Sequence, residues 1–242
     1  MRTLYLCVVL FKERGICGKA EGRSMRLRHI AGSEDFVLQS DAAVREPARF
    51  RGRWKEDFFR NHAPIHIEIG MGKGRFLTEL SLLHPEINFL GIERYDSVLM
   101  KAIQRRKRAE KEGADFSNLS FLSIDARLLP EVFSENEISR IYLNFSDPWP
   151  KTRQKNRRLT SPVFLRIYRS FLKAEGELRF KTDNEALFRY SLESISSSGW
   201  SLLEKTEDLH RDPVLSRGNV MTEYEKKFSE RGNPIFALYA RP

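Results

Sequence analysis

The chain has 242 residues, and 40% of them are hydrophobic, enough to build the core of one large α/β domain. Lys and Arg number 42 against 33 Asp and Glu. The resulting net charge of +9 favours a polyanionic partner. The two cysteines, Cys7 and Cys17, exclude a disulfide framework and a four-thiolate metal site, and the five histidines show no paired metal-ligand spacing. We therefore expect a reduced, cytoplasmic protein that binds no metal.

The first 24 residues contain a short apolar run at 3–11 that superficially resembles a signal peptide. The run lacks a convincing cleavage site and is far too short to span a bilayer, so we expect no membrane association. Because Met25 begins a typical soluble start, our hypothesis is that residues 1–24 are an N-terminal extension added by the choice of start codon. N-terminal sequencing of the native protein that begins at Met1 would refute it.

Residues 25–62 form a basic N-terminal segment with one short amphipathic helix at 54–59, and residues 63–242 form the main domain. We predict strands at 65–69, 87–93, 119–125, 138–145, 176–182, 200–205 and 235–240, and helices at 75–83, 96–111, 162–172 and 184–197. Strands that alternate with helices indicate a mostly parallel, seven-stranded sheet with helices on both faces. Since the crossovers are right-handed, the carboxyl ends of the parallel strands should share one open edge.

A glycine loop follows the first predicted strand and contains Gly70, Gly72 and Gly74. A dinucleotide site would need the spacing G-x-G-x-x-G, and Arg75 breaks it, which makes a nicotinamide dehydrogenase a distant alternative. The alternate spacing, with Glu68 just before it, suits a cofactor with an amino-acid tail and no phosphate. A plain tight turn is the other interpretation of these glycines.

Two further acids end predicted strands at the same edge of the sheet. Glu93 ends the second strand, about twenty residues past the glycines, where it could accept from both ribose hydroxyls. Asp125 ends the third and could reach an adenine amino group. Each acid alone could also be a solvated strand end or a helix cap. Together with Glu68 they describe a pocket for S-adenosylmethionine.

The segment at 144–151 follows the fourth predicted strand and carries Asp147, Trp149 and two prolines. Prolines stiffen the backbone, and an acid held beside a flat aromatic ring suits a nucleobase. The cations that follow, at 151–158, suit phosphates better than a solvated surface. A second cationic face, with Lys101, Arg105 and Arg108 on the helix at 96–111, fits a solvated surface and an RNA track equally well. The loop at 144–151 is therefore interpreted as part of an active site that acts on nucleic acid.

Five segments resemble the motifs of the tRNA (guanine-N7-)-methyltransferase family, namely residues 68–74, 144–151, 157–160, 180–184 and 219–225. The resemblance extends from about residue 46 to the end of the chain, in the family's order. It implies a Rossmann-like class I methyltransferase fold, S-adenosylmethionine as methyl donor, and a guanosine in the tRNA variable loop (guanine-46 type) as acceptor. One departure is Gln154, where the family often carries a histidine in the cationic loop.

The resemblance also implies roles for individual residues. The implied cofactor-binding residues are Glu68, Gly70, Gly72, Gly74, Glu93, Asp125, Asn144 and Asp147, and Asp147 is also the implied catalytic residue. The implied substrate-binding residues are Lys151, Arg157, Arg158, Asp183, Thr222, Glu223, Tyr224 and Glu225. Residues 222–225 fit a helix N-cap with acids in the first turn as well, and both roles can hold for Thr222.

Two other functions remain open from the sequence. One is methylation of an exocyclic amine on another RNA, on DNA or on protein, because short proline-aromatic loops also occur in amino-methyltransferases. The other is a catalytically silent RNA-binding relative with the same fold, against which the intact acids argue. The expected partner is tRNA, and the protein is expected to be a monomer or a homodimer.

Overall fold

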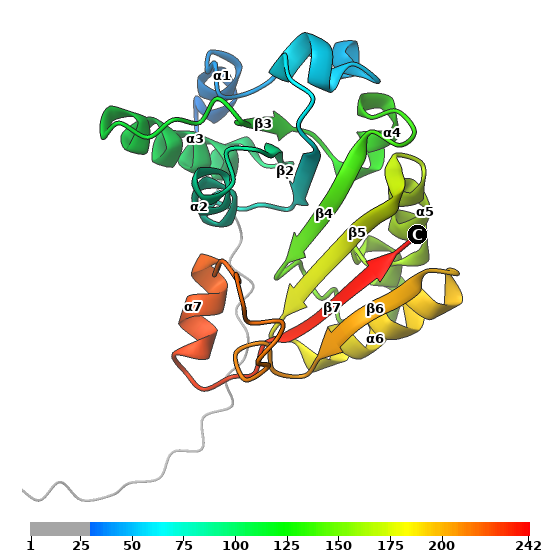
Figure 1. The fold of residues 1–242 in the computed structure, drawn as a ribbon. Coiled ribbons are helices and arrows are strands. Elements are labelled where there is room, and N and C mark those ends of the chain that lie inside the picture. The colour runs from blue at the N-terminus through cyan, green and yellow to red at the C-terminus, as the bar shows by residue number, and fades with distance from the viewer. Residues whose placement is uncertain (1–29) are drawn as a thin grey trace, which may run out of the picture.

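The computed structural model describes residues 30–242 (Figure 1). The hypothesis that residues 1–24 are an extension lies outside the described residues, as do residues 25–29 of the basic segment. In the described part of that segment, α1 (Ser33–Leu38), η1 (Pro47–Phe50) and η2 (Trp54–Phe59) precede the sheet. The predicted helix at 54–59 is present, as one wide π-helical turn.

One seven-stranded sheet forms the centre of the molecule, in the order β3-β2-β1-β4-β5-β7-β6. The strands are β1 (Ile65–Ile69), β2 (Asn88–Glu93), β3 (Leu119–Ser123), β4 (Ile138–Asn144), β5 (Leu172–Thr182), β6 (Ser201–Thr206) and β7 (Phe236–Arg241). Within this sheet β7 runs opposite to the other six strands, which are parallel to one another. The Rossmann-like, mostly parallel architecture expected from the sequence is confirmed.

The connections contain the remaining helices. These are α2 (Arg75–Leu83), α3 (Asp96–Lys111), η3 (Ala126–Leu128), α4 (Leu129–Val132), η4 (Thr152–Arg157), α5 (Pro162–Arg169), α6 (Glu185–Ser197) and α7 (Glu223–Ser229). Within residues 30–242, no helix is both long and apolar enough to cross a bilayer.

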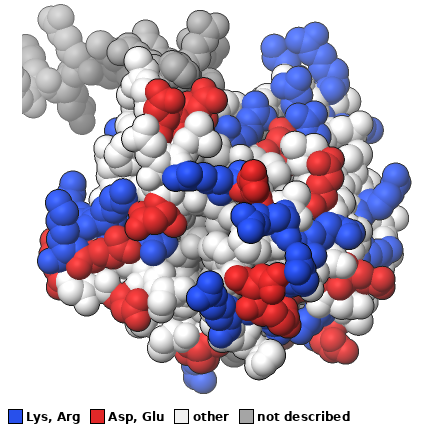
Figure 2. Space-filling model, turned by 90° about the horizontal axis from the view of Figure 1, so that it is seen from above, with Lys and Arg blue, Asp and Glu red and all other residues white. Residues whose placement is uncertain are grey.

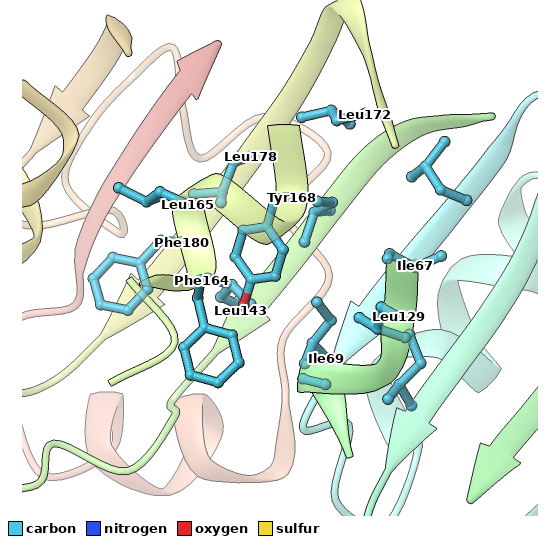
Figure 3. Close-up of a cluster of buried hydrophobic side chains, with 14 of the residues drawn as sticks. Ile67, Ile69, Leu129, Leu143, Phe164, Leu165, Tyr168, Leu172, Leu178 and Phe180 are labelled. Atoms are coloured by element: carbon cyan, nitrogen blue, oxygen red, sulfur yellow. The ribbon is translucent and has the colours of Figure 1, made fainter. Parts of the chain in front are cut away.

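Side chains that alternate along the strands build two cores, one on each face of the sheet. Ile67 and Ile69 of β1 face a cluster completed by α4, α5 and α6, in which Tyr168 of α5 is fully buried (Figure 3). On the opposite face, Phe89 of β2 and Phe121 of β3 pack against α1, α2 and α3. Each such side chain contributes about 1.5–3 kcal/mol through burial, so both helical layers are held firmly to the sheet.

The boundary between α5 and β5 differs from the prediction. The helix ends at Arg169 rather than at 172, and the strand begins at Leu172 rather than at 176. The register with β4 shifts between Ile138 and Arg140, so the strand bulges over residues 173–176. A Cβ on Gly176 would stand only 2.7 Å from the Leu172 side chain, which folds over that glycine. The bulge hides the period on which the prediction relied.

The parallel pairing of β3, β2, β1, β4 and β5 puts their carboxyl ends along one edge of the sheet, and Figure 1 shows those of β4 and β5 at its lower end. Figure 2 shows the molecule from above, where η1, η2 and α4 lie at the other end of the sheet. On that face Lys and Arg alternate with Asp and Glu. The excess positive charge is therefore not gathered there into one continuous patch.

Candidate active site

The glycine loop between β1 and α2 depends on backbone conformations that other residues adopt poorly. Gly70, Gly72 and Gly74 all have positive φ, at 74°, 58° and 72°, which explains why every second residue is glycine. The amide of Gly70 donates to the carbonyl of Ile92 at 2.9 Å and ties the loop to β2. A Cβ on Gly74 would lie 2.9 Å from that of Ala102, so this glycine also lets α2 approach α3.

Glu68 and Asn144 meet at the floor of this loop, from the neighbouring strands β1 and β4. The Asn144 amide nitrogen donates to Glu68 Oε1 at 2.8 Å, and Glu68 is only 2% exposed. Glu68 Oε2 and Asn144 Oδ1 are buried and have no partner among the described residues. Burial raises the pKa of Glu68 to about 8, although the Asn144 hydrogen bond and the nearby Lys181 charge oppose the shift.

Two unpaired buried oxygens are costly unless a ligand donates to them. An ammonium group, with three N–H donors, would satisfy both and would favour the ionised carboxylate. The residues present therefore fit the amino-acid tail that the glycine spacing suggests.

Glu93 faces the glycine loop from the end of β2. It is 8% exposed, and its two carboxylate oxygens accept from the amides of Gly72 at 3.2 Å and Tyr95 at 3.1 Å. Burial raises the pKa of this carboxyl, and the backbone donors oppose that effect. Glu93 is thus held beside the glycine loop, and its role in cofactor binding stays a prediction.

Asp125 lies two residues beyond the end of β3, where it caps η3 through the amide of Arg127. Its carboxylate also accepts from Arg127 Nε at 2.9 Å and Nη2 at 2.7 Å. These bonds lower the pKa of Asp125 to about 2. A ligand at this position would have to share the carboxylate with a guanidinium, which the sequence did not indicate.

The loop after β4 holds two non-glycine residues with positive φ, Phe145 at 52° and Trp149 at 41°. Such conformations cost of order 1–3 kcal/mol each and persist only where the surroundings hold them. Arg158 donates to the carbonyl oxygens of Pro148 at 2.9 Å and Trp149 at 3.2 Å, and its guanidinium stacks on Tyr190. The side chain of Arg158, a predicted substrate contact, is therefore turned onto the loop that carries Asp147.

Four predicted site residues in this loop, after it and after β5 are accessible. Asp147 and Lys151 are exposed, and Asp183 after β5 is half-buried. Among residues 30–242, none of these three makes a side-chain hydrogen bond or an ion pair. Arg157 is exposed and lies over the Trp149 ring at 5.0 Å. These side chains are available to a ligand.

The segment at 222–225 forms the start of α7. Thr222 and Glu225 make a capping box, with Thr222 Oγ1 accepting from the Glu225 amide at 3.0 Å. Glu223 pairs with Lys73 of the glycine loop, 3.6 Å away, and with Arg105 of α3. Tyr224 is 53% exposed. The capping interpretation of the segment is confirmed by this geometry, and the substrate role stays a prediction.

Lys181 of β5 is a site residue to which the sequence assigned no role. It is 5% exposed, and its ammonium lies 2.7 Å from Glu225 Oε2 and 5.2 Å from the Phe76 ring centroid. Lys181 continues the alternation of Glu177 and Arg179 along β5, so no signal of its burial is visible in the sequence. His210 Nε2 lies 3.1 Å from Glu225 Oε1 and joins the same cluster.

Residues 62–238 match a family model described as "Putative methyltransferase". The tRNA (guanine-N(7)-)-methyltransferase of Lachnoclostridium phytofermentans is 52% identical over 216 residues, which is 89% of this chain and 98% of that protein. The protein of the same name from Bacillus velezensis is 48% identical over 88% of this chain and 94% of its own length.

Solved structures agree on the fold. The structure of an antibiotic-related methyltransferase aligns with a TM-score of 0.57 at 19% identity, over 76% of this chain and 90% of its own. That of the 16S rRNA methyltransferase KamB aligns with a TM-score of 0.56 at 13% identity, over 74% and 88%. The fold is thus that of the class I methyltransferases. The sequence relatives, which match over nearly their full length, identify the family within that fold. The chain belongs to the tRNA (guanine-N7-)-methyltransferase family.

Proposed function

We propose that the protein transfers a methyl group from S-adenosylmethionine to N7 of a guanosine in the variable loop of tRNA, of the guanine-46 type. The observation that carries the proposal is that Glu68 Oε2 and Asn144 Oδ1 are buried without hydrogen-bond partners among the described residues, next to the glycine loop and at the end of β4. The names of the relatives supply the acceptor, guanine N7 of tRNA. A cytoplasmic location is part of the proposal.

The cofactor would lie along the ends of β1, β2 and β3. Glu68 and Asn144 would hold its ammonium group, and the glycine loop would let the backbone approach the amino-acid tail. Glu93 would accept from the ribose hydroxyls, and Asp125 would face the adenine beside Arg127. Bound S-adenosylmethionine supplies a methyl group on a positively charged sulfur.

On the acceptor side, the task of the chain is alignment. Guanine N7 carries an in-plane lone pair, so no side chain has to remove a proton before attack. The loop clamped by Arg158 would place Asp147 near the purine, where a fixed carboxylate stabilises the positive charge that develops on the ring. Asp183 would accept from N1 and the exocyclic amine of guanine and thereby reject adenine. Lys151 and Arg157 would contact phosphates.

The test is incubation of the protein with labelled methyl donor and unmodified bulk tRNA, followed by nucleoside mass spectrometry. The expected product is 7-methylguanosine. Reductive aniline cleavage of the product tRNA should break the chain at one position in the variable loop. Label in an exocyclic amine, or in protein, would overturn the proposal, as would the absence of any transfer.

A further inference from the structure

The ammonium group of Lys181 is fully used inside the protein. It donates to Glu225 Oε2 at 2.7 Å, to Asn219 Oδ1 at 2.9 Å and to the carbonyl of Val220 at 3.1 Å. A lysine has three N–H donors, and all three end on one short segment. Burial lowers the pKa of Lys181, and the Glu225 carboxylate opposes that shift.

Glu225 is the partner on the other side and has no exposed surface. Besides Lys181, its carboxylate accepts from Asn219 Nδ2 at 2.5 Å and from the Thr222 amide at 3.4 Å, and His210 Nε2 lies 3.1 Å away. The carboxylate is therefore saturated by protein groups. In this arrangement a tRNA cannot reach it.

The ion pairs of its first turn hold the start of α7 against β5 and beside the glycine loop. On the inner side, Glu225 binds Lys181 of β5, and on the outer side Glu223 pairs with Lys73 of the glycine loop. Tyr224 lies between them, exposed, with its ring stacked 6.5 Å from that of Phe145, the first residue of the loop that carries Asp147. Lys181 thus sets the position of the exposed side chain of Tyr224.

We propose that Lys181 is a positioning residue, which anchors residues 219–225 beside the loop that carries Asp147 through Glu225, so that Tyr224 meets the tRNA while Glu225 acts only through this ion pair. The inference rests on the proposed function, because the segment is useful only if tRNA is the substrate. It replaces the expected substrate contact of Glu225 with an indirect role.

The test compares Lys181→Met, Glu225→Gln and the double variant with Lys205→Met, which changes an exposed lysine on β6. Removing one partner leaves a buried charge without its counter-ion, so each single variant should lower the Tm, and the double variant should recover most of that loss. The KM for tRNA should rise about tenfold or more in all three, because the anchor is absent from each. Lys205→Met should match the wild type.

Hydrogen exchange gives a second measurement that needs no activity. The amides of residues 219–226 should exchange faster in Lys181→Met and in the double variant, while those of α2 keep their protection. A merely structural role predicts instead that KM recovers together with Tm in the double variant. That recovery, or unchanged exchange at 219–226, would overturn the inference. A wild-type protein that methylates no tRNA would refute the proposed function, and the exchange experiment would still decide the anchor.

Discussion

Asn144 donates one hydrogen bond to Glu68 across two adjacent strands, at 2.8 Å, and the remaining oxygen of each side chain is buried without a partner among residues 30–242. Burial keeps the pKa of Glu68 at about 8, so the carboxyl is mostly protonated at neutral pH. A cationic ligand group at this position would favour the ionised form. Binding and proton release should therefore be coupled.

We predict that S-adenosylmethionine binding at pH 7 releases close to one proton, and that affinity increases as the pH rises from about 6 toward 8. Isothermal calorimetry in two buffers of different ionisation enthalpy measures the number of protons released. Glu68→Gln should bind more weakly and release none. Binding without proton release by the wild type would show that Glu68 is already ionised in the free protein.

The same carboxyl should affect stability in the absence of ligand. The folded pKa, about 8, lies above the ordinary value of 4.5, so the native state holds the proton more tightly than the unfolded chain. The free energy of unfolding should then fall as the pH rises from about 4.5 to 8, by up to about 1.4 kcal/mol per unit of pKa shift. Urea unfolding at pH 5 and pH 8 should show a smaller loss for Glu68→Gln. An equal loss in both proteins would refute the prediction.

Asp147 should be important for transfer and unimportant for folding. Its side chain is exposed and makes no hydrogen bond or ion pair within residues 30–242, so Asp147→Asn should keep the Tm and the affinity for tRNA. Loss of the carboxylate should lower kcat by about 10²–10³, the usual effect of removing one group that stabilises developing charge. Single-turnover assays with saturating tRNA measure it. Near-normal turnover would remove Asp147 from the mechanism.

Substitutions of the neighbouring residues Arg158 and Arg157 should have different effects on kcat and on the KM for tRNA. Arg158 holds the carbonyls of Pro148 and Trp149, so Arg158→Ala should lower kcat by at least about tenfold because Asp147 is no longer held in place. Arg158→Lys should not rescue it, since an ammonium cannot reproduce a two-pronged contact.

Arg157→Ala is the matched control for this pair. Arg157 is exposed and makes a cation–π contact with Trp149 but no hydrogen bond within the described chain. Its loss should raise the KM for tRNA, leave kcat nearly unchanged, and reduce the salt dependence of tRNA binding by about one counterion. The reverse assignment of the two effects would contradict the geometry described above.

Much of the fold could be predicted because its signals are local. The strands at 65–69 and the helix at 75–83 lie where the sequence placed them, since the apolar period and the capping glycine are properties of adjacent residues. The start of β5 could not be predicted, because a bulge at 173–176 interrupts the period. Its existence depends on pairing with β4, which is distant in sequence.

Sequence alone determined the layers of the fold, the alternation of the glycines, and the acids at the ends of β1 and β2, because backbone geometry and strand direction follow from neighbouring residues. Tertiary structure alone decided how the long charged side chains are used. Lys181 meets a carboxylate 44 residues away, Arg158 turns onto the loop before it, and Asp125 is taken by Arg127. The partner of a long, flexible side chain depends on distance and burial in the folded molecule. Neither quantity can be inferred from the neighbouring residues in the sequence.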